Sequence, residues 1–129
     1  MFDQLDFLYC PSPDIEVDIA HYTEGLGGEL VFAIEAFGTK VAQVALAPGA
    51  PAVLLAQHLA GEQPILIFRV ASLADAVAEL AGRGVTSGPE FGFPHGEGVE
   101  VDLPGPQRIA IYELTRPERG ASLAGRKDF

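Results

Sequence analysis

Hydrophobic and polar residues alternate with two different periods along the chain. The apolar run Leu5–Cys10 is typical of a strand, and the segment Pro11 to Pro13 ends it. A helical pattern begins at Asp14, whose carboxylate is suited to accept a backbone N–H of the first turn. Apolar residues then recur on one face of this helix at Ile15, Ile19, Tyr22 and Leu26. Gly27 and Gly28 supply the stop, so the pattern predicts a strand followed by one helix.

Three strand-like runs follow this helix. They are Glu29–Phe37, Lys40–Leu46 and Ala52–Gln57, separated by Gly38 and by the turn Pro48–Pro51. The first part of the chain is therefore predicted to have the order β-α-β-β-β.

The same order returns about 58 residues later. Pro64–Val70 is typical of a strand, and Ser72 is a predicted N-cap with Asp75 three positions on. The apolar face of the second helix is predicted to consist of Leu73, Val77 and Leu80, with its end at Gly82 or Gly84. After it come a short run near Val85, a glycine-rich loop over Ser87–Gly98, and two strands, Gly98–Leu103 and Arg108–Glu113.

The repeat predicts an α+β fold. Neither half has enough sheet area to cover its own faces, so we expect two βαβββ modules to form a curved mixed sheet around a pocket, with the helices outside. The predicted parts are a first module over 1–61, a second over 62–115, and a basic C-terminal tail over 116–129.

Charge and composition exclude several classes of function. Eighteen acidic against eight basic residues give a formal charge of −10, which argues against binding to nucleic acid or to anionic membranes. No stretch approaches the roughly 20 apolar residues of a membrane span, and the N-terminus lacks a signal segment, so we expect a cytoplasmic protein. The single cysteine, Cys10, excludes an intrachain disulfide and a zinc site built from several thiolates.

The tail differs in charge from the rest of the chain. Arg116–Phe129 carries four basic and two acidic side chains, which leaves the remainder at −12. We expect the segment Arg116–Lys127 to be loop-like. It either lies along an acidic flank of its own body or of a second subunit, or frays as a free terminus.

Several segments together resemble the vicinal oxygen chelate superfamily, which includes glyoxalase I, bleomycin-resistance proteins and extradiol dioxygenases. The resemblance covers roughly residues 3 to 115 and rests on HYTEGLGGELV (His21–Val31), IFRVASLADAVAELAGRGV (Ile67–Val85), PHG (Pro94–Gly96) and DLPGPQRIAIYE (Asp102–Glu113). Where the family often shows D-P-D-G-N, this chain has Asp102 to Gln107 as DLPGPQ.

The resemblance also implies where a metal would be held. Metal-dependent members place His, Glu or Gln at four strand positions, and spacing from the helix caps and strand ends carries these over to Phe7, Leu54, Ile65 and Ala110. None of these side chains offers a nitrogen, oxygen or thiolate donor. We therefore expect a member without the metal site and with no cofactor.

Strand alternation extends the predicted pocket, because residues two apart share a face. The predicted ligand-binding residues are Phe7, Tyr9, Leu54, His58, Ile65, Ile67, Arg69, Arg108, Ala110 and Tyr112, with Phe91 and Phe93 from the glycine-rich loop as a lid or a dimer contact. The alternatives are that the arginines pair with surface carboxylates such as Glu100, and that His58 is an exposed loop residue. Equally, Tyr9 and Tyr112 can be core residues with hydrogen-bonded hydroxyls, and the phenylalanines can pack into the body. His95 and Glu97 of the same loop are candidates for acid or base chemistry.

Three functions fit these expectations. The leading hypothesis is a homodimeric, metal-independent protein of the glyoxalase and bleomycin-resistance type that binds a small aromatic or apolar molecule. The second is a lyase, isomerase or dioxygenase of the same superfamily with metal ligands relocated to His58, His95, Glu35, Glu97 or Glu100. The third is an interaction module whose pocket is filled by its own side chains.

Overall fold

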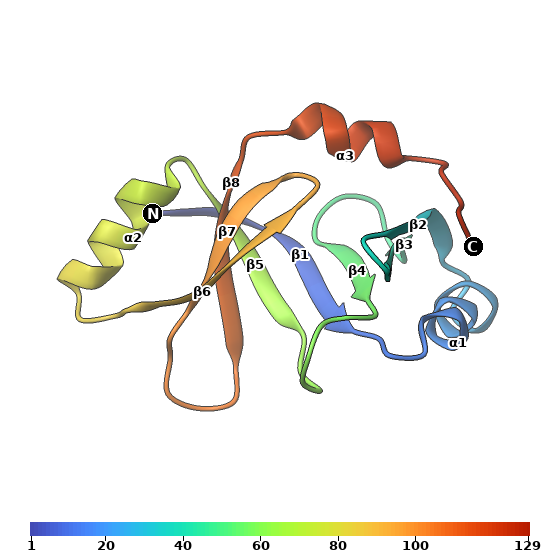
Figure 1. Ribbon diagram of the computed structural model, residues 1–129, viewed down its shortest axis with the longest axis horizontal. Coiled ribbons are helices and arrows are strands. Elements are labelled where there is room, and N and C mark those ends of the chain that lie inside the picture. Colours follow the sequence, from blue (N-terminus) through green and yellow to red (C-terminus); the bar gives the residue numbers. More distant parts are fainter. The chain divides into compact units, whose positions relative to one another are not determined.

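A computed structural model describes all 129 residues and contains two successive βαβββ runs (Figure 1). The first run consists of β1 (Phe2–Pro11), α1 (Ile15–Ala20) continued by the π-helical turn η1 (His21–Gly25), β2 (Glu29–Ala36), β3 (Thr39–Ala45) and β4 (Ala52–Ala56). The second consists of β5 (Ile65–Val70), α2 (Leu73–Gly82), β6 (Ser87–Phe93), β7 (Gly96–Val101) and β8 (Arg108–Leu114), and α3 (Pro117–Leu123) follows it. The α+β class and the repeated order are confirmed.

The chain divides into two compact units, each built on a four-stranded mixed sheet. The C-terminal unit comprises Met1–Asp6 and Ile65–Ser122, with strand order β5-β8-β7-β6 and a parallel β5–β8 pair. The N-terminal unit comprises Phe7–Pro64 and Leu123–Phe129, with strand order β2-β3-β4-β1 and a parallel β1–β4 pair. Each unit therefore includes one terminal segment from outside its own βαβββ run.

The core of the N-terminal unit lies between α1 and its sheet. Ile15 is fully buried against Ala33, Ala42, Val44 and Leu55, which come from β2, β3 and β4. Two details of the predicted helix are wrong. Asp14 occupies the N-cap position without a side-chain hydrogen bond, and Leu26 is 66% exposed. The wider π-helical turn changes the angular spacing, so a residue predicted from a 3.6-residue period leaves the buried face.

The core of the C-terminal unit lies between α2 and the face of its own sheet that carries Val70, Val99 and Ile111. Ser72 Oγ accepts a hydrogen bond from the Asp75 backbone N–H at 3.2 Å, which confirms the predicted cap. A second bond, from Leu73 N to Glu113 Oε1 at 2.8 Å, ties the start of α2 to β8. The predicted apolar face of the helix packs on Val70 and Ile111 as expected.

The segment Ser87–Gly98, predicted as a loop, is instead the hairpin of β6 and β7. Its glycines serve close packing: a Cβ at Gly98 would lie 2.7 Å from the carbonyl oxygen of Ile111 and 2.7 Å from the ring of Phe91. Pro89 is tolerated because β6 is the last strand of its sheet.

The tail is also more ordered than predicted. Residues 117–123 form the helix α3, with Pro117 at its first position, where the missing N–H costs no hydrogen bond. Beyond it the chain pairs with β2 through a parallel bridge between Ala33 and Lys127. This agrees with a tail that lies along its own body and not with a frayed terminus. No helix in the structure combines the length and hydropathy needed to cross a membrane.

Candidate functional site

One face of the C-terminal unit's sheet carries most of the predicted residues from that part of the chain. The parallel register pairs Ile65 with Arg108, Ile67 with Ala110, and Arg69 with Tyr112, so these six side chains alternate onto the same side. Ile65, Ile67 and Ala110 are buried. The middle of this face is therefore apolar, with a cationic group at each end.

The two phenylalanines extend this face across β7 and β6. Phe91 lies opposite Gly98 and Phe93 opposite Gly96 in the hairpin register. The Phe93 ring meets the Tyr112 ring edge to face with 5.1 Å between centroids, and Phe91 is 5.8 Å from Phe93. Phe93 is buried and Phe91 half-buried, so the structure places them as strand residues packed over glycines.

A buried carboxylate that the sequence analysis missed organises the polar end of this face. Asp6 is only 8% exposed, and it pairs with Arg69 through Nε to Oδ2 at 2.9 Å and Nη2 to Oδ1 at 3.3 Å. The Tyr112 hydroxyl and the Gln4 amide donate two further hydrogen bonds to the same carboxylate. This ion pair, in which Nη2 donates the hydrogen bond and Nε lies in close contact, places the guanidinium beside Asp6, with the Arg69 side chain one-third exposed at 33%.

Burial shifts the pKa values of two side chains that interact with Asp6, namely Tyr112 and His95. Burial, with a smaller contribution from the hydrogen bond to Asp6, raises the pKa of Tyr112 far above its usual value. Burial lowers the pKa of His95, and the charge of Asp6 opposes that shift only in part. The Tyr112 hydroxyl therefore stays a proton donor, and the His95 imidazole favours its neutral form.

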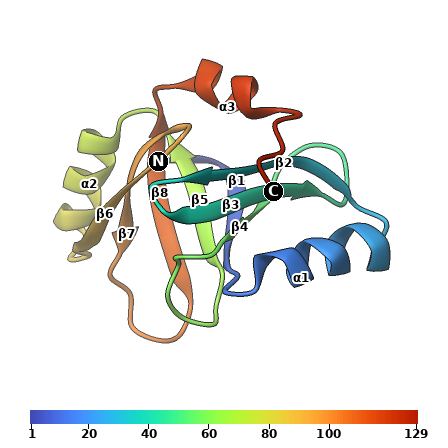
Figure 2. The ribbon, with the colours of Figure 1, turned by 45° about the vertical axis from the view of Figure 1, so that its right-hand side comes forward.

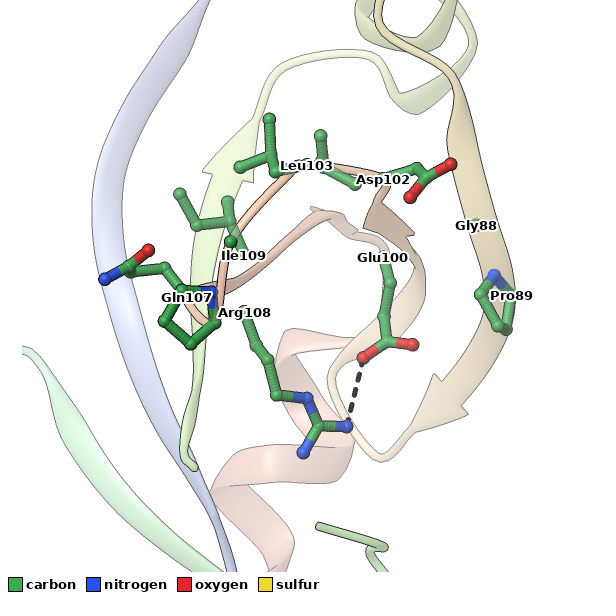
Figure 3. A pocket seen from close by; sticks show the side chains of 11 residues that line it. Gly88, Pro89, Glu100, Asp102, Leu103, Gln107, Arg108 and Ile109 are labelled. Carbon is green, nitrogen blue, oxygen red and sulfur yellow. Dashed lines mark hydrogen bonds and ion pairs between the residues drawn. The ribbon is translucent and has the colours of Figure 1, made fainter. Parts of the chain in front are cut away.

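A pocket opens on the C-terminal unit around the β7–β8 turn (Figure 3). Its volume is about 450 Å³, within the range of small-molecule sites. Arg108 Nη2 lies 3.3 Å from Glu100 Oε1, and the figure shows these two side chains pointing toward each other. The remaining lining combines apolar and polar groups: Gly88, Pro89, Val101, Asp102, Leu103, Gly105, Pro106, Gln107 and Ile109. Among the predicted ligand-binding residues, Arg108 alone lines this pocket. Its ion pair with Glu100 agrees with the alternative prediction that the arginines pair with surface carboxylates.

The remaining predicted residues belong to the N-terminal unit and lie on β1, on β4 or just after β4. Phe7 and Leu54 are buried, and Leu54 lies opposite Tyr9 in the β1–β4 register. The Tyr9 hydroxyl is 3.4 Å from His58 Nε2, and His58 Nδ1 is 3.1 Å from Thr39 Oγ1. His58 itself is exposed just after β4. Burial raises the pKa of Tyr9, so its hydroxyl also stays protonated.

The side chains at the four positions where the superfamily resemblance implies a divalent ion cannot coordinate one. The N-terminal unit places Phe7 and Leu54 at the carried-over positions, and the C-terminal unit places Ile65 and Ala110 there; all four are buried hydrocarbon side chains. No group of three His, Cys, Asp or Glu residues comes close enough together to hold a metal ion.

Two of the proposed relocated ligands are engaged in ion pairs. Arg116 Nη1 contacts Glu97 Oε1 at 2.8 Å, and Arg108 contacts Glu100. A metal at either carboxylate would have to compete with an arginine for the same oxygen atoms.

Comparison with known proteins identifies the fold through structure and not through sequence. No protein-family model matches the chain, and no curated protein matches it significantly. Among solved structures, methylmalonyl-CoA epimerase from Mycobacterium tuberculosis has a TM-score of 0.73 at 21% identity, with 93% of each chain covered. The hypothetical protein BH1468 from Bacillus halodurans C-125 has a TM-score of 0.72 at 16% identity, covering 85% of this chain and 93% of that one.

A larger enzyme matches over part of its length. Glyoxalase I from Zea mays, as its V278E mutant, has a TM-score of 0.63 at 12% identity, covering 88% of this chain and 44% of the enzyme. The epimerase and glyoxalase I both belong to the superfamily that the sequence motifs resemble. At these identities the likeness establishes the fold.

Proposed function

Since the chain has the fold of the vicinal oxygen chelate superfamily, we propose that it is a small-molecule binding protein that works without the superfamily's metal ion. The observation that carries this proposal is the chemistry of the four carried-over positions. Buried side chains of Phe, Leu, Ile and Ala stand where a divalent ion would need nitrogen or oxygen donors. The proposed ligand class is an apolar or aromatic molecule, whose apolar contacts would come from the pocket described above and not from these four positions.

The pocket around the β7–β8 turn is the proposed binding place. It offers apolar contacts from Pro89, Leu103 and Ile109, together with the Arg108–Glu100 pair, which orients polar groups of a ligand. Its two carboxylates, Glu100 and Asp102, are balanced by only one arginine. The pocket lining thus contains both negatively and positively charged side chains. A set of test ligands must therefore include neutral, cationic and carboxylate-bearing aromatic compounds.

Calorimetric titration of the full chain in the presence of EDTA tests this function. We expect at least one aromatic probe to bind with a dissociation constant in the range of about 1 μM to 1 mM. Arg108→Ala should weaken that binding about tenfold or more, since it removes the orienting cation. Arg83→Ala is the matched control, because Arg83 pairs with Glu79 on the exposed side of α2, outside the pocket lining.

Two results would count against the proposal. Failure of every aromatic and cationic probe to bind would remove the binding function itself. Equal affinity of the Arg108→Ala and Arg83→Ala variants for the ligand would show that the ligand binds outside this pocket.

A further inference from the structure

Three neighbouring strands of the N-terminal unit bring Tyr9, His58 and Thr39 into one hydrogen-bonded chain. The His58 imidazole lies at its centre: its Nδ1 atom is 3.1 Å from Thr39 Oγ1, and its Nε2 atom is 3.4 Å from the Tyr9 hydroxyl oxygen. The Tyr9 and His58 rings meet edge to face, with 6.4 Å between their centroids. Each ring nitrogen of His58 thus has one hydroxyl partner.

Strand register places Thr39 beside His58. Figure 2 shows the hairpin of β2 and β3, and β3 begins at Thr39, just after the turn of this hairpin. β3 is antiparallel to β4, with Val41 opposite Ala56. Thr39 precedes Val41 by two residues and His58 follows Ala56 by two, so the antiparallel direction brings their side chains together. β1 lies on the other side of β4 and supplies Tyr9.

The chain of hydrogen bonds runs from a buried phenol to accessible groups. Tyr9 is only 9% exposed, whereas Thr39 is half-buried and His58 is exposed. When His58 Nε2 carries the imidazole proton, it donates to the Tyr9 oxygen and leaves Nδ1 to accept the proton of the Thr39 hydroxyl. Hydroxyl, imidazole and orienting group in this order are the arrangement that activates a nucleophile. Catalytic hydrogen bonds are often long in proteins without bound substrate.

We propose that Thr39, His58 and Tyr9 form an acyl-transfer site for carboxylic esters with a weakly basic leaving group such as a phenolate. Thr39 Oγ1 attacks the acyl carbon while its proton passes to His58 Nδ1. The bond from the acyl carbon to the leaving oxygen breaks, and that oxygen takes the proton from His58. Water then hydrolyses the acyl–Thr39 ester with His58 as the base, which releases the carboxylic acid and restores the hydroxyl. Tyr9 is a positioning residue, since it acts through His58.

The site is independent of the binding function proposed above. Its three residues belong to the N-terminal unit, whereas the pocket around the β7–β8 turn is lined by residues of the C-terminal unit. The test therefore uses an ester, para-nitrophenyl acetate, with no pocket ligand present. Its failure would leave the binding function standing, and failure of the binding probes would leave this site standing.

Hydrolysis of para-nitrophenyl acetate by the full chain tests the nucleophile. Thr39→Val keeps a β-branched residue in β3 but removes the hydroxyl, and it should slow release of para-nitrophenolate about tenfold or more. Thr23→Val is the matched control, because the Thr23 hydroxyl donates to the Ile19 carbonyl oxygen and should not affect the rate. Thr39→Ser restores a hydroxyl and should restore most of the activity. Equal rates for Thr39→Val and the wild type would overturn the proposal, as would a Thr39→Ser rate as low as that of Thr39→Val.

Two further variants test the imidazole and the phenol. His58→Gln should slow release about tenfold or more, whereas His21→Gln, at an exposed position on η1, should not. Tyr9→Phe keeps the ring and removes the hydroxyl, so it should lower kcat and leave KM unchanged. A His58→Gln chain as active as His21→Gln would overturn the proposal, and an unchanged kcat in Tyr9→Phe would contradict the positioning role.

Mass mapping of the acid-quenched reaction locates the acyl group. The acetyl group should lie on Thr39 in the wild type and be absent from this position in Thr39→Val. An acetyl group on His58 in both proteins, with none on Thr39, would show that the imidazole acts alone as the nucleophile and would overturn the proposal.

Discussion

The Tyr112 hydroxyl donates a hydrogen bond to the Asp6 carboxylate, which comes 106 positions earlier in the chain. Both side chains are buried, and Arg69 completes the arrangement with its ion pair to Asp6. The first strand of the chain is thereby joined to β5 and β8 of the C-terminal unit. Because a buried carboxylate is costly without partners, this contact ties the stability of the unit to three residues far apart in sequence.

Replacing Tyr112 by Phe should lower the free energy of unfolding by about 1–2 kcal/mol. The ring and its contact with Phe93 remain, whereas the buried Asp6 carboxylate loses one of its donors. Urea denaturation measures the change. Tyr22→Phe is the control, since the Tyr22 hydroxyl makes no hydrogen bond within the protein; it should change the unfolding free energy by less than about 0.5 kcal/mol. Equal effects of the two variants would show that the hydroxyl contact contributes nothing.

The half-buried His95 predicts a pH dependence of stability. Burial lowers the pKa of His95 in the folded chain, so the unfolded chain binds more protons as the pH falls through the ordinary histidine range. The unfolding free energy should therefore decrease from about pH 7 to pH 5. His95→Gln should make this decrease shallower. His21→Gln, at an exposed position on η1, should leave it unchanged, and an unaltered slope in His95→Gln would contradict the assignment.

Gly120 of α3 faces His95 so closely that a side chain there would clash. A Cβ at Gly120 would overlap the His95 ring, so Gly120→Ala should destabilise the fold by about 1–3 kcal/mol. Gly82→Ala is a matched helix control, because a Cβ at Gly82 meets nothing within 4 Å. It should be neutral or stabilising by up to about 1 kcal/mol, since alanine is the better helix former. Thermal unfolding of the two variants checks the contrast, and equal stability would show that α3 does not pack on His95.

The repeated βαβββ order was predictable because it depends on hydrophobic periodicity, turn residues and helix caps, all of which are local features of the sequence. Ser72 does cap α2, and strand alternation does place Ile65, Ile67 and Arg69 on one face with Arg108, Ala110 and Tyr112. These features need only periodicity, turn residues and a cap.

The features that were missed depend on tertiary contacts. Alternation assigns Asp6 and Phe7 to opposite faces, yet both side chains are buried. Asp6 is enclosed by its partners Arg69 and Tyr112, which lie far from it in sequence, so local patterning does not predict its burial. The hairpin β6–β7 contains Pro89 and several glycines, and these residues indicate a loop unless a close neighbour such as Phe91 over Gly98 is known. The helix α3 is short and contains Gly120, so its formation depends on packing that the local sequence does not encode.

Metal content tests the central claim most directly. Elemental analysis of the full chain, purified without chelator and then dialysed, should find divalent metal well below one ion per chain, because the four carried-over positions offer only hydrocarbon side chains. A stoichiometric divalent ion would contradict the metal-independent account and favour a metal-dependent lyase, isomerase or dioxygenase.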